Sequence, residues 1–77
     1  MVRIDLPHGP VELDRVVVER LRDVAAASAG RSSAARDLSI VLTRALAEPG
    51  TVALRRAELQ TLLEVAETAG LRDALML

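Results

Sequence analysis

The chain has 77 residues and a formal net charge of −1, so it fits a single small domain, residues 1–77, without the strong positive charge typical of nucleic-acid-binding domains. It has no Cys and one His, which excludes disulfides and thiolate metal sites, and we expect neither a metal nor a cofactor. Half of the residues (51%) are hydrophobic, yet none is Phe, Tyr or Trp. Because small aliphatic side chains bury little area each, we expect a thin core that a partner completes.

The first predicted element is a β-hairpin. Val2–Leu6 alternates apolar and charged residues, as a half-buried strand does, and Val11–Leu13 resumes the alternation. The Pro-His-Gly-Pro segment at 7–10 predicts a four-residue loop between the two strands. In a competing interpretation, a helix begins at Pro10 and includes Val11, which leaves no hairpin.

Two helices are predicted next. Apolar residues three and four apart predict a helix over 14–29, with Asp14 as its N-cap and Gly30 just beyond its end. Ser32 or Ser33 then caps a second helix over 33–47, which the following Pro-Gly pair stops. The short connection predicts that these helices form an antiparallel pair.

A second Val-x-Leu segment, Val52–Leu54, resembles Val11–Leu13 and also precedes a helix. Leu54 is out of phase with the apolar stripe of that third helix, which is Leu59, Leu62, Leu63, Ala66 and Ala69 and which ends at Gly70. We therefore predict a third strand, followed by a tail at 71–77 that forms either a helical turn or a strand.

Together these elements predict a small α+β domain of order ββααβα, with three helices and a three-stranded sheet. The alternative fold is mostly α with one N-terminal strand. The two Val-x-Leu segments are either an internal duplication or a shared way of starting a helix after a strand.

The sequence offers little catalytic chemistry, so we expect no enzyme. His8 lies alone in the Pro/Gly turn, and the chain has no Lys, Cys or Tyr to act as a nucleophile or acid. The helical carboxylates fall outside the apolar stripes, where a solvated surface is expected. An enzyme would require a carboxylate such as Glu19 or Glu64 to have a pKa in the neutral range.

The order of elements resembles that of ribbon-helix-helix DNA-binding proteins, a family that includes many antitoxins. The resemblance rests on the strand at Val2–Pro7, a helix over 14–29, the Gly30-Arg31-Ser32 turn and a helix over 33–47. It implies a homodimer whose paired strands enter the major groove of DNA, with nucleic acid as the partner. The implied DNA contacts come from Arg3, Asp5, Arg31 and Arg36.

The favoured prediction is a non-enzymatic protein–protein interaction module that binds itself or another protein, as a homodimer or a small subunit of a bacterial assembly. Its interface is predicted from an aliphatic face of the second helix and from the tail: Leu38, Leu42, Leu46, Leu75 and Leu77. No uncharged stretch is long enough to span a bilayer and none resembles a signal peptide, so we expect a cytoplasmic protein with no membrane partner.

Overall fold

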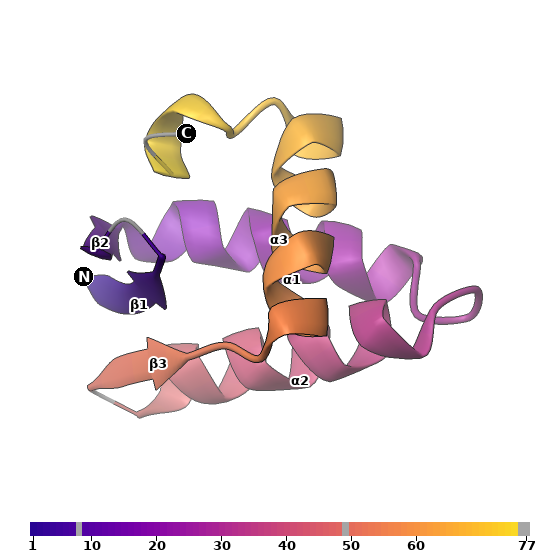
Figure 1. Ribbon diagram of the computed structural model, residues 1–77, viewed down its shortest axis with the longest axis horizontal. Coiled ribbons are helices and arrows are strands. Elements are labelled where there is room, and N and C mark those ends of the chain that lie inside the picture. Colours follow the sequence, from indigo (N-terminus) through magenta and orange to yellow (C-terminus); the bar gives the residue numbers. More distant parts are fainter. Residues whose placement is uncertain (8, 49, 76–77) are drawn as a thin grey trace.

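The structure, a computed structural model, describes residues 1–7, 9–48 and 50–75 and confirms the predicted α+β fold (Figure 1). Its elements follow the predicted ββααβα order and end in a short 3₁₀ turn, η1. They are β1 (Val2–Leu6), β2 (Gly9–Leu13), α1 (Arg15–Ala27), α2 (Ser33–Ala47), β3 (Thr51–Ala53), α3 (Arg56–Ala69) and η1 (Asp73–Leu75).

The hairpin prediction is confirmed, because β1 and β2 are antiparallel with Val2 opposite Leu13 and Leu6 opposite Gly9. A helix from Pro10 and a fold with only one strand are therefore both wrong. The loop is shorter than predicted, since β1 ends at Leu6 and Gly9 already pairs in β2. Gly9 has a φ of 127°, a conformation that residues with a Cβ rarely adopt, so glycine is needed where the chain turns back.

The sheet has the order β2-β1-β3, which places β1 in the centre. β3 pairs with β1 in parallel, with Val52 opposite Ile4, and this pairing connects segments that are far apart in the chain. β3 covers Thr51–Ala53, one residue earlier than the predicted strand, and Leu54 follows it as a half-buried residue. Both edges of β1 are therefore occupied within the chain.

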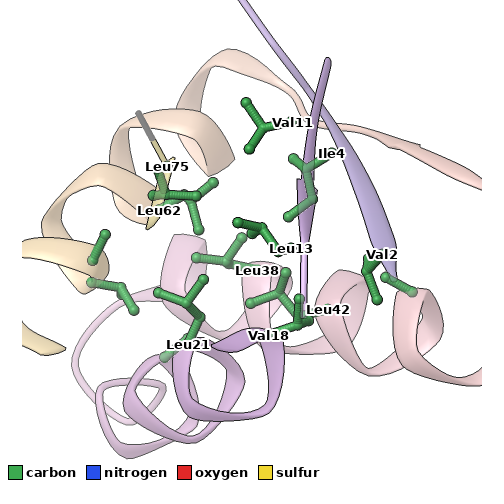
Figure 2. Packing of buried hydrophobic residues seen from close by; sticks show 14 of the residues in the cluster. Val2, Ile4, Val11, Leu13, Val18, Leu21, Leu38, Leu42, Leu62 and Leu75 are labelled. Atoms are coloured by element: carbon green, nitrogen blue, oxygen red, sulfur yellow. The ribbon is translucent and has the colours of Figure 1, made fainter. Parts of the chain in front are cut away.

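All three helices pack against one another on the inner face of the sheet, and α3 runs across α1 and α2 (Figure 1). The core that they enclose is aliphatic, and Figure 2 shows Leu13, Leu21, Leu38, Leu42 and Leu62 converging in it. Alternate strand residues such as Ile4 face this core, whereas Arg3 and Asp5 face outward. Leu75 of η1 is fully buried and closes the core beside Leu62 (Figure 2).

The predicted helix ends are confirmed at most positions. Ser32 caps α2 by accepting a hydrogen bond from the Ala35 N–H (3.2 Å), and Gly70 ends α3 in the left-handed conformation with a φ of 71°. Asp14 occupies the N-cap position of α1, but its side chain makes no cap hydrogen bond. At the other end of α1 the cap is Ser28, so the helix stops earlier than Gly30.

One hydrogen bond connects the start of α1 to the end of α2. The Arg15 guanidinium donates to the Leu46 carbonyl at 2.8 Å. The last carbonyls of a helix have no partner within it and carry partial negative charge, so a cation is favourable there. This contact joins the start of α1 to the end of α2 where the two helices run antiparallel. Asp37, Ile40 and Arg44 of α2 remain exposed.

Candidate partner-binding groove

The open side of α2 forms a groove with β3 and the start of α3. The groove contains two cavities, of about 220 and 150 Å³, and Val41 and Arg44 line both of them. We call this surface the α2 groove and define it by its lining residues: Asp37, Ile40, Val41, Arg44, Ala45, Glu48, Gly50, Thr51, Val52, Arg55 and Glu58.

The larger cavity lies between the second half of α2 and β3. Val41 and Val52, both half-buried, give it an apolar wall, while Arg44 and Glu48 supply charges of opposite sign. β3 is an edge strand in the described sheet, so alternate backbone groups of β3 point away from β1. This half of the groove therefore combines apolar surface with backbone hydrogen-bonding groups.

Glu58 lines the smaller cavity and is a buried charged residue. Glu58 is the third residue of α3, and its residue exposure is only 5%. Oε1 accepts a hydrogen bond from the Arg55 backbone N–H at 3.0 Å and lies 3.5 Å from Arg55 Nε. This contact caps the first turn of α3, where an anion is also favoured by the helix dipole.

The second carboxylate oxygen of Glu58, Oε2, is buried and has no hydrogen-bond partner among the residues that the structure describes. A buried acceptor that lacks a donor costs about 1–3 kcal/mol, and more when the group is charged. Asp37, Ile40, Arg44 and Arg55 line the same cavity. The lining of this cavity therefore includes a carboxylate whose second oxygen lacks a donor within the described chain.

An exposed apolar residue lies at the rim of the groove. Ile40 is 46% exposed and lies beside half-buried Val41 on α2. The other large apolar side chains that are exposed, Met1 and Val16, are not among the lining residues of the groove. Of the three, Ile40 is thus the one that lines the same cavity as Glu58.

The leucines predicted to meet a partner lie elsewhere. Leu38, Leu42 and Leu75 are fully buried in the core of the single chain, and Leu46 is 9% exposed. Leu77 lies outside the described residues. The α2 face that the sequence analysis assigned to a partner instead packs against α1, α3 and the sheet. It is not available as a docking surface, because the same chain already covers it.

The predicted DNA contacts do not form one surface. Arg3 and Asp5 lie on the outer face of β1, Arg31 is in the turn between α1 and α2, and Arg36 is exposed on α2. The ribbon-helix-helix arrangement needs a strand that is free to pair with a second copy. Here β1 already has β2 and β3 as neighbours, so it has no free edge for such a pairing in the described sheet.

Arg3 instead pairs with Glu12 across the hairpin, at 2.7 Å between Nη2 and Oε1. The hydrogen bond from Arg3, together with its positive charge, lowers the pKa of the Glu12 carboxyl. A lowered folded-state pKa means that the pair contributes stability above the pKa of the unfolded chain and loses it as pH falls through the folded value. The contribution is small because both side chains are about half exposed.

Replacing Arg3 by Ala is therefore expected to raise the pKa of Glu12, as measured by NMR titration of its carboxyl resonance. The small difference in stability between the variant and the unmodified chain should disappear as the pH falls below the pKa of Glu12 in the folded chain. Added salt should also reduce it, since exposed charges are screened. An unchanged Glu12 titration in the variant would contradict the assignment of the shift to Arg3.

In the part of the chain that the structure describes, no cluster of His, Asp and Glu is arranged to hold a metal ion. Within residues 1–7, 9–48 and 50–75, no helix has the length and apolar character needed to cross a bilayer. His8, the lone histidine considered in the sequence analysis, lies outside the described residues.

Glu58 is one of the groove residues that sequence reasoning missed. The usual signal for such a glutamate is Ser or Thr three positions earlier, in a capping box. Here the preceding cap residue is Arg55, so the pattern is absent. Comparisons of the chain with protein-family models, curated proteins and solved structures found no match, so the groove is interpreted from its own chemistry.

Proposed function

We propose that this chain is a non-enzymatic protein–protein interaction module that binds its partner through the α2 groove. The observation that carries the proposal is the position of Ile40, an exposed apolar residue that lines a cavity together with Glu58, a buried glutamate with one unpaired carboxylate oxygen among the described residues. Recognition sites of proteins combine apolar contact with a few polar groups that fix orientation.

The size of the chain is compatible with this role. A standard protein–protein interface buries about 800 Å² on each partner. The accessible surface of this chain is 4880 Å², so such an interface would use about a sixth of it. The free edge of β3 adds backbone donors and acceptors along one wall of the groove.

The test is site-specific photo-crosslinking in the native cell, with a photoreactive amino acid in place of Ile40. Val16 is the matched control, because it is apolar, is 73% exposed and lies on α1 rather than in the groove. We expect a covalent adduct with a protein, either a second copy or another chain, from position 40 and little from position 16. No adduct at position 40, or equal adducts from both positions, would contradict the proposal.

A further inference from the structure

The charges along the groove side of α2 are self-complementary. Asp37, Ile40, Val41 and Arg44 are spaced three and four residues apart, which places them on one face of the helix. Asp37 and Arg44 are equally far from the midpoint between Ile40 and Val41, on opposite sides of it. When two copies of such a face meet antiparallel across a two-fold axis at that midpoint, each Asp37 lies opposite an Arg44.

These two charges are both free to make such pairs. Asp37 and Arg44 are exposed, and neither takes part in an ion pair among the residues that the structure describes. They are separated by about 10.5 Å along the helix axis, at about 1.5 Å per residue, which is too far for them to pair with each other. Within the described part of the single chain, neither charge is therefore balanced by an ion pair.

From this arrangement we propose that the α2 groove binds the α2 helix of a second copy of this chain, with Asp37 of each copy paired to Arg44 of the other. Ile40 and Val41 of the two copies pack together at the centre of the interface. The proposal rests on the proposed function and names its partner. It would also bury the exposed side chain of Ile40 against the second copy.

The buried carboxylate of Glu58 fits the same arrangement. Asp37, Arg44 and Glu58 line one cavity, and Oε2 of Glu58 lacks a donor. The guanidinium of Arg44 from the second copy has several N–H donors, enough for both carboxylates. When it enters the cavity it makes a charge-assisted contact with Asp37 and brings a positive charge close to Glu58, which lines the same cavity.

Charge reversal at the two paired positions tests the dimer directly. Asp37→Arg and Arg44→Asp each replace attraction by repulsion in both symmetric pairs, so each variant alone should weaken self-association about tenfold or more in sedimentation equilibrium. An equimolar mixture should associate again, because a chain with two arginines then faces a chain with two aspartates. The double variant D37R/R44D should recover part of the association, because opposite charges again face each other at positions 37 and 44, although Glu58 then lacks the arginine of the second copy.

Arg20→Asp on α1 and Glu67→Arg on α3 are matched controls, since both residues are exposed and lie outside the groove. Neither is expected to change the dissociation constant. The proposal is overturned if the unmodified chain is monomeric at all concentrations, or if neither the mixture nor the double variant associates more tightly than the single variants. A monomeric chain that still gives a position-40 adduct with another protein would overturn the dimer and leave the proposed function supported.

Glu58→Gln tests the role of the cavity separately. The amide keeps an oxygen for the Arg55 N–H, so α3 remains capped and the circular dichroism spectrum should not change. Loss of the negative charge should weaken self-association several-fold, because the arginine of the second copy then meets one carboxylate instead of two. An unchanged dissociation constant would show that Glu58 does not receive the arginine.

Discussion

Leu38→Ala is expected to remove about 2–5 kcal/mol from the free energy of unfolding, because it leaves a cavity where a fully buried leucine packs between the helices and the sheet. A domain of this size has a total stability of only about 4–12 kcal/mol. The variant should therefore lose a large fraction of its stability, and a urea titration followed by circular dichroism measures the loss.

The control for Leu38→Ala is Val16→Ala, which truncates an apolar side chain that is 73% exposed and should change stability by about 0.5 kcal/mol or less. The comparison also separates the core from an interface. If Leu38 belonged to a partner-binding face, its truncation would weaken association and leave the single chain about as stable as Val16→Ala. Equal urea midpoints for the two variants would contradict the packing described above.

Asp5→Pro is expected to cost about 1–3 kcal/mol through the backbone alone, since it removes a ladder N–H and leaves an acceptor of a neighbouring strand without its donor. The Asp5 side chain is exposed and contributes little packing. Its strand is central, with Pro10 of β2 opposite it on one edge and Ala53 of β3 on the other, so the lost N–H faces a neighbour in either direction. Pro10 is tolerated because β2 is an edge strand.

Asp5→Ala is the control for this second prediction, because it removes the same side chain and keeps the N–H. It should be within about 0.5 kcal/mol of the unmodified chain in the same urea titration. If Asp5→Pro were as stable as Asp5→Ala, β1 would have a free edge, and the topology required for a ribbon-helix-helix dimer would again be possible.

Local patterns in the sequence were sufficient for the element order. Period-2 alternation located β1 and β2, and the phase of Leu54 against the third helix located β3 to within one residue. These signals are local because strand and helix periods are properties of neighbouring residues. The parallel pairing of β3 with β1 could not be predicted in this way, since it joins residues about fifty positions apart and depends on how α1 and α2 pack.

The buried face of α3 shows where the local signal ends. The predicted stripe included Leu59, Leu63 and Ala69, but the structure buries Glu58, Thr61, Leu62, Val65 and Ala66, with the three predicted residues only half-buried. Apolar residues surround much of this helix, so periodicity alone does not choose among its faces. The packing of α3 across α1 and α2 determines which face of α3 is buried, and it places Glu58 at the groove.

The candidate site was the least predictable part. The sequence indicated that aliphatic residues of α2 would meet a partner, and the structure uses Leu38 and Leu42 for its own core instead. The side of α2 that remains open carries Asp37, Ile40 and Arg44, which look like ordinary surface residues in the sequence. Their proposed role in binding depends on the cavity that they form with Glu58, and this tertiary feature has no sequence signature.

The most direct test of the α2 groove as the self-association surface is a dilution series followed by amide resonances in ¹H–¹⁵N spectra of the unmodified chain. The expected result is that resonances of residues 37–44 and of Glu58 shift with concentration along a two-state curve, while those of the outer sheet face stay fixed. Shifts centred on the outer sheet face, or none over the whole concentration range, would contradict the account.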